Sequence, residues 1–244
     1  MKKIFYALMC TAALALVSCN LYDAMKYSQE ISEGTDPSYD KYPGMNANED
    51  PLTGRPFAWP ATFKLNSLIM GEQNQSSEED QDASMKITEN MYGSGLFVIV
   101  TLDITNLTND DQVLELPHGL LIQATSSSYQ NGILVKDVKI PFEPKETRQV
   151  SVRFYCLNSS LHGSDSGAEY APLGLITNIP AFDPLFNVAE GKKLNIDQYK
   201  SISLLGYYGA CTTVQEIVWA ITKGKTFKES EIEKYLKHVK KDRG

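Results

Sequence analysis

The chain has 244 residues, a formal net charge of −7 and 22% charged residues. It contains no cluster of Lys and Arg with interleaved aromatic residues, so we do not expect nucleic acid as a partner. The length is enough for one large or two small domains with real hydrophobic cores, and we expect two domains.

The N-terminus has the pattern of a bacterial export signal. It begins MKK, and residues 4–17 form an apolar run that is too short to span a bilayer permanently. The motif LVSC at residues 16–19 resembles the lipobox of bacterial lipoproteins. This resemblance implies that the signal peptide, residues 1–18, is removed and that Cys19 carries the lipid. Such chemistry requires Cys, because only a thiolate is nucleophilic enough near neutral pH.

The expected lipid places the protein in the bacterial cell envelope. Two or three acyl chains anchor a protein stably, so we expect the N-terminal lipid to provide the attachment to the membrane. Asn20 follows Cys19, where Asp would be the usual signal for retention in the inner membrane. We therefore expect the outer membrane, on its periplasmic face or at the cell surface.

Residues 19–60 are rich in Asn, Asp, Glu, Ser, Gly and Pro and poor in aliphatic residues. A segment of this composition cannot bury enough apolar surface to order itself. The composition predicts a disordered tether that starts at the lipidated Cys19 and holds the folded part away from the membrane.

Residues 61–158 contain β-branched, partly alternating runs separated by turn residues, which predict about seven short strands. The clearest runs are 95–104, 133–140 and 150–156. The DITNLT motif at 103–108 and the PKETR motif at 144–148 resemble immunoglobulin-like accessory domains of envelope proteins. We therefore expect an immunoglobulin-like antiparallel β-sandwich in the mainly β part of the chain.

Residues 159–244 have a different pattern, and we expect a small, mainly helical domain there. Helices are predicted over 183–188 and 196–205, since the first begins with a capping Asp. A third is predicted to start at Thr212 or Thr213 and to stop at Gly224, and a last amphipathic helix to start at Ser230.

Two cysteines remain for the folded part, because Cys10 leaves with the signal and Cys19 is used by the anchor. In an exported protein, Cys156 and Cys211 are candidates for a disulfide. Cys156 also lies in an apolar strand, where a free buried thiol is common. These alternatives stay open at the level of the sequence.

A third alternative comes from two motifs. FYCL at 154–157 and VQEIVW at 214–219 together resemble the two signatures of bacterial thioester adhesin domains, an aromatic-Cys element on a strand and an apolar-Gln element opening a helix. The resemblance implies an internal thioester between the Cys156 thiol and the Gln215 side chain, which an amine on a partner surface opens to leave a covalent link.

No acid/base pair with recognisable spacing occurs, so a hydrolytic enzyme ranks last and we expect no catalytic activity. The three histidines, His118, His162 and His238, are scattered and predict no zinc site, and we expect no metal and no cofactor. The sequence favours a lipid-anchored adhesion or partner-binding module whose ligand is a surface protein or a glycan.

Overall fold

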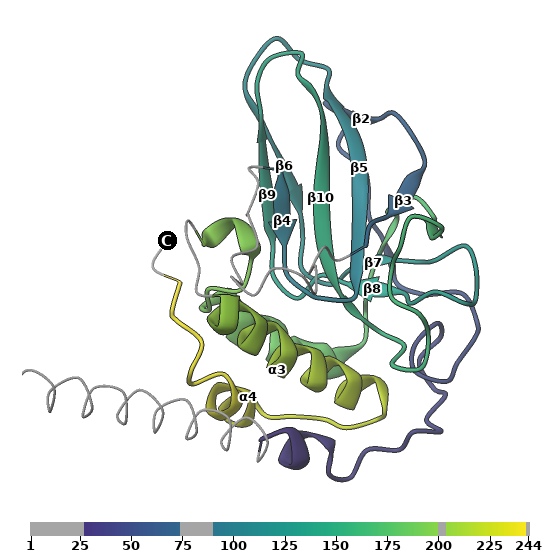
Figure 1. Ribbon diagram of the computed structural model, residues 1–244, viewed down its shortest axis with the longest axis vertical. Helices are drawn as coiled ribbons and strands as arrows, with labels where there is room; N and C mark the ends of the chain where they lie inside the picture. The colour runs from purple at the N-terminus through teal and green to yellow at the C-terminus, as the bar shows by residue number, and fades with distance from the viewer. Residues whose placement is uncertain (1–26, 74–89, 200–203, 243–244) are drawn as a thin grey trace, which may run out of the picture.

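The computed structural model describes residues 27–73, 90–199 and 204–242. It is mainly antiparallel β-structure with helices towards the C-terminus (Figure 1). The expected β-sandwich followed by a small helical region is therefore confirmed.

Two long strands form the centre of the main sheet. β5 (Val98–Asn106) and β10 (Thr147–Cys156) are antiparallel partners over the register from Thr147 opposite Thr105 to Phe154 opposite Val98. Both were predicted as strands. The sheet follows the order β1-β12-β7-β8-β10-β5-β3-β11, with β2 also on β5 and β4 on β10. The shorter strands of this sheet are β1 (Arg55–Pro56), β2 (Phe63–Leu65), β3 (Ile69–Gly71), β4 (Met91–Gly93), β7 (Leu120–Ile122), β8 (Gly132–Ile133), β11 (Glu169–Tyr170) and β12 (Leu175–Ile176).

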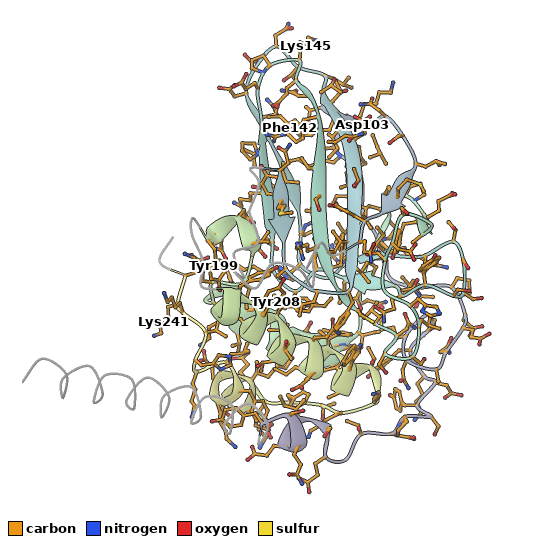
Figure 2. The ribbon with its side chains drawn as sticks, in the orientation of Figure 1. Asp103, Phe142, Lys145, Tyr199, Tyr208 and Lys241 are labelled. Carbon is orange, nitrogen blue, oxygen red and sulfur yellow. The ribbon has the colours of Figure 1, made fainter. Side chains whose placement is uncertain are left out.

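A second layer is the two-stranded antiparallel sheet of β6 (Gln112–Leu116) and β9 (Val138–Phe142). In both strands buried and exposed residues alternate, because successive side chains in a strand point to opposite faces. Leu114, Ile140 and Phe142 share one core with Val100 and Val152 of the main sheet. The two-stranded sheet and the main sheet thus form the two layers of the sandwich, and Lys145 lies at the far tip of the sandwich (Figure 2).

The helices cover the other end of the main sheet. They are α2 (Asp183–Glu190), α3 (Leu204–Thr222) and α4 (Glu229–Tyr235), with short 3₁₀ turns at Pro180–Phe182 and Ile196–Gln198. α3 passes across the end of β10, and α4 lies on the side of α3 away from the sheet (Figure 1). Tyr155 and Leu157 share a second core with α2, α3 and α4. The helices therefore complete one fold with the sandwich instead of forming a separate domain.

Three expectations for residues 159–244 need correction. The chain returns to the sheet as β11 and β12 before any helix begins. The helix predicted over 196–205 begins instead as a 3₁₀ turn at Ile196–Gln198, where Gln198 Oε1 accepts from the Asn195 backbone N–H at 3.0 Å, and Tyr199 is already extended; residues 200–203 lie outside the described part of the chain. α3 extends from Leu204, well before the predicted N-cap, whereas its predicted stop is confirmed by Gly224 at φ +87°.

The predicted tether is wrong for its larger part, because residues 27–60 are folded onto the body. Residues 27–32 are helical and lie beside α4 (Figure 1). Tyr27, Ile31, Met45 and Leu52 are all buried in the core of the helical end. These four apolar side chains, widely spaced among polar ones, find their partners in helices far along the sequence.

Polar contacts hold the same segment in place. Lys225 donates from Nζ to the carbonyl oxygens of Glu30 and Glu33 at 2.7 and 2.8 Å. The Ser28 hydroxyl donates to Glu216 at 2.8 Å. Further along, the Asn131 side chain donates to the carbonyl of residue 44 at 2.8 Å. The folded body therefore begins at or before residue 27.

Candidate functional site

The structure brings Cys156 and Gln215 into direct contact. The Cys156 backbone N–H donates to Gln215 Oε1 at 2.9 Å, and Gln215 Nε2 donates to the Cys156 carbonyl oxygen at 2.8 Å. Cys156 is fully buried and Gln215 is 1% exposed. The amide of Gln215 thus forms two reciprocal hydrogen bonds with one strand residue, 59 positions earlier in the chain.

This contact occurs where β10 loses its neighbour. β5 pairs with β10 only as far as Phe154, while β8 pairs with Tyr155 and Cys156 on the other edge. Before β5 the chain turns through Gly95 at φ +131°, where an added Cβ would lie 2.1 Å from the Phe154 carbonyl oxygen. At Cys156 the Gln215 side chain fills the edge of β10 that β5 leaves open. Its amide hydrogen-bonds the backbone N–H and C=O of Cys156, as the backbone of β5 does for the residues of β10 before it.

The same face of α3 also reaches the sulfur of Cys156. Trp219 lies four residues after Gln215, and residues with this spacing share one face of a helix. Its Nε1–H donates to Cys156 Sγ at 3.4 Å, and the backbone N–H of Asn158 donates to the same sulfur at 3.3 Å. α3 therefore contacts Cys156 twice, through an amide beside its backbone and an indole on its thiol.

The thiol is protonated in the folded protein. Burial raises the pKa of Cys156 to about 12, although the hydrogen bonds from Trp219 and Asn158 and the charge of Lys223 act in the opposite direction. Lys223 is four residues after Trp219. A thiolate formed during a reaction would therefore have two N–H donors and one nearby positive charge.

The competing disulfide is not formed, since Cys156 and Cys211 are both free. The reason is that successive side chains of β10 point to opposite faces of the sheet. Tyr155 points to the helical core, where its hydroxyl contacts Cys211 Sγ at 3.9 Å, and Cys156 points to the opposite face and belongs to the sandwich core. A bridge would require a side chain of β10 to change face.

A polar cleft of about 280 Å³ lies nearby, between the 44–50 segment and the loops around residues 123–131 and 158–161. Its amides are engaged in holding the fold. Asn158 donates to the carbonyl of Gly44 at 3.1 Å, and Asn46 donates to the carbonyls of Pro37 and Tyr39 at 2.9 Å. The amides of Asn46 and Asn158 are therefore occupied within the protein, and Glu49, Asp50 and Ser127 also line the cleft.

Cys19 lies outside the described residues, as do the predicted signal peptide and the first residues of the predicted tether. In the described part of the chain, no group of three or more His, Cys, Asp or Glu side chains is arranged to hold a metal ion. None of the helices within 27–73, 90–199 and 204–242 is long and apolar enough to cross a membrane.

Sequence reasoning identified Cys156 and Gln215 but missed two features of their surroundings. Trp219 appeared only as the last residue of the VQEIVW motif, although its place one turn after Gln215 predicts that both face the same neighbour. Phe97, which stacks on Trp219, appeared only as a strand residue. Comparison of the chain with protein-family models, curated proteins and solved structures gives no match.

Proposed function

We propose that this protein is a lipid-anchored envelope protein that binds a partner and attaches to it covalently through an internal thioester between Cys156 and Gln215. The observation that supports this proposal is the reciprocal pair of hydrogen bonds between the Gln215 amide and Cys156. Cys19 carries the lipid, and the protein resides in the outer membrane.

The geometry suits thioester formation for a specific reason. The Gln215 amide lies beside the backbone of Cys156, while the Cys156 side chain leaves the same residue roughly perpendicular to the sheet. The sulfur thus belongs to the residue that the amide contacts, and addition of the sulfur to the carbonyl carbon would take place from one face of the amide plane. The Cys156 N–H, at 2.9 Å from Oε1, is in place to stabilise the oxygen as it becomes negative.

Formation of the thioester releases one molecule of ammonia. The Cys156 sulfur forms a bond to the Gln215 side-chain carbon, the carbon–nitrogen bond breaks, and the thiol proton leaves with the nitrogen as ammonia. When an amine later attacks the same carbon, the carbon–sulfur bond breaks and the proton of the amine returns to the sulfur. Trp219, Asn158 and the charge of Lys223 stabilise the sulfur in both directions.

The test is the intact mass of the mature chain with Cys19→Ala. The proposal predicts a mass lower than the sequence mass by one ammonia, with this loss absent from Cys156→Ala and from Gln215→Ala. Cys211→Ala is the matched control, because Cys211 is an equally buried cysteine on the other face of β10 and must leave the loss unchanged. An unmodified mass in freshly prepared protein would contradict the covalent mechanism.

The second candidate is a binding module without covalent chemistry, in which Gln215 only completes the open edge of β10. The burial of both residues favours it, because a buried backbone N–H and C=O need partners whatever the function. In this case the measured mass equals the sequence mass, and only the proposed lipid anchor at Cys19 remains to be tested. Cys19→Ala in the intact precursor should then move the protein from the membrane fraction to the soluble fraction.

A further inference from the structure

The positive charge of the chain is concentrated near its C-terminus. Residues 223–244 contain eight Lys or Arg and four Asp or Glu, whereas residues 1–222 contain 15 and 26. Four exposed lysines lie at the end of α4 and in the segment after it: Lys234, Lys237, Lys240 and Lys241. We call these four residues the basic face. They collect positive charge at one end of a chain that is acidic elsewhere.

The N-terminal segment joins the fold at this basic face. Tyr27, the first residue that the structure describes, packs edge-on against Tyr235 of α4 with ring centroids 5.4 Å apart. The Nζ atoms of Lys234 and Lys237 lie 5.6 and 5.1 Å from the centroid of the Tyr27 ring. The chain that comes from Cys19 therefore enters the folded body next to two lysine ammonium groups.

Three carboxylates close to the basic face pair with other lysines or with Lys234. Glu30 pairs with Lys234 at 2.6 Å, and Glu233 pairs with the buried Lys192 at 3.1 Å. Asp242 pairs with a lysine from the loop before β9. These three carboxylates therefore do not offset the positive charge of the lysines that follow α4.

The segment after α4 is held on the surface by backbone hydrogen bonds. The N–H of Lys193 donates to the carbonyl of Lys240 at 2.8 Å, and the N–H of Asp242 donates to the carbonyl of Gly191 at 3.0 Å. The segment runs along the outside of the helical end (Figure 1), where Lys241 is labelled in Figure 2. The lysines therefore belong to an ordered surface and are positioned before any partner binds.

We propose, on the basis of the lipid anchor proposed above for Cys19, that the basic face binds the anionic phospholipid headgroups of the membrane that holds the anchor. Each lysine close to an anionic bilayer strengthens binding about fivefold. The acidic sandwich opposes this binding little, because salt screens charges that lie more than about 8–10 Å from the headgroups. The helical end then lies against the bilayer, and the sandwich tip at Lys145 points away from it (Figure 2).

The experiment uses the mature chain with Cys19→Ala, so that no acyl chain contributes to binding. Sedimentation with vesicles of phosphatidylcholine, alone or mixed with phosphatidylglycerol, measures the partition coefficient at low and high salt. We expect binding to the mixed vesicles at low salt, and its loss at high salt and on phosphatidylcholine alone. The combined substitutions Lys237→Gln, Lys240→Gln and Lys241→Gln should lower the partition coefficient by roughly a hundredfold.

The matched control makes the same change of charge on the sandwich, with Lys64→Gln, Lys139→Gln and Lys145→Gln. All three lysines are exposed, and the control should bind as the parent does. Equal losses in both triple variants would overturn the basic face, because net charge alone would then explain the binding. Equal binding to both kinds of vesicle, or none to the mixed vesicles at low salt, would overturn it as well.

Two further outcomes are distinct. Binding to soluble heparin without binding to mixed vesicles would assign the lysines to a soluble polyanion and overturn the membrane as their partner. The anchor is judged separately, by the intact mass of the wild-type protein purified from bacterial membranes. A mass without acyl chains would overturn the lipid on Cys19, whatever the vesicles show.

Discussion

The reciprocal hydrogen bonds of Gln215 should contribute measurably to stability even when no thioester can form. The comparison is made in a Cys156→Ala background, which removes the thiol and keeps the backbone of residue 156. Gln215→Met in that background keeps the length and apolar volume of the side chain but removes both hydrogen bonds. It leaves a buried N–H and a buried C=O on β10 without a partner.

An unsatisfied buried polar group costs about 1–3 kcal/mol, so two of them predict a loss of about 2–6 kcal/mol in the free energy of unfolding. Urea unfolding followed by circular dichroism measures this loss as a lower midpoint with an unchanged slope. A loss below about 1 kcal/mol would refute the reasoning, because the open edge of β10 would then be satisfied without Gln215.

Gln215→Glu in the same background adds a test by pH. A protonated Glu accepts from the N–H and donates to the C=O of residue 156, but a carboxylate can only accept. Burial beside a carbonyl should therefore raise the pKa of this Glu in the folded state. Its stabilising contribution is then present below the unfolded pKa, about 4.3, and is lost as the pH rises through the folded value. We expect the urea midpoint of this variant to lie close to that of the Gln215 parent at low pH and well below it at neutral pH.

Three further predictions concern other parts of the chain. Burial raises the pKa of Glu216, so the stability that Glu216 contributes is lost as the pH rises through its pKa in the folded state. In urea unfolding, Glu216→Gln should therefore be more stabilising, relative to the parent protein, at neutral pH than at acid pH. Both thiols should resist iodoacetamide in the native protein, because burial raises the pKa values of Cys156 and Cys211. In urea without reductant, mass spectrometry of the mature chain with Cys19→Ala should find one labelled cysteine when Gln215 is present and two when Gln215→Ala is added; two labelled cysteines with Gln215 present would contradict the thioester. Ile31→Ala should cost about 2–5 kcal/mol by the same unfolding assay, since Ile31 is 1% exposed, whereas a disordered tether would lose nothing.

The sequence predicts best where the pattern is local. β-branched runs identify β5 and β10, and Gly224 marks the end of α3, because each signal is contained within a few neighbouring residues; the run predicted at 133–140 is divided between the end of β8 and the start of β9. The start of α3 is missed, because Gly206 and Gly209 lower the helical signal while tertiary packing of the surrounding residues maintains the helix.

The N-terminal segment is mispredicted for the opposite reason. Tyr27 meets Tyr235 edge-on at 5.4 Å, a contact between residues that are distant in sequence. Composition treats each apolar residue in a polar stretch as exposed, and only the folded helices provide the surface that buries it. The Cys156–Gln215 contact was found because a pair of motifs carried it, whereas the stacking of Phe97 on Trp219 has no sequence signal.

The folded N-terminal segment also limits where this protein can act. Only seven residues separate Cys19 from Tyr27, and at ~3.3–3.6 Å per residue they span roughly 30 Å at most, whatever their conformation. With a lipid on Cys19, as we propose, the body is confined to a layer next to the bilayer. Its partner must come within that layer, so the search for it should begin among molecules that share or closely approach the same membrane.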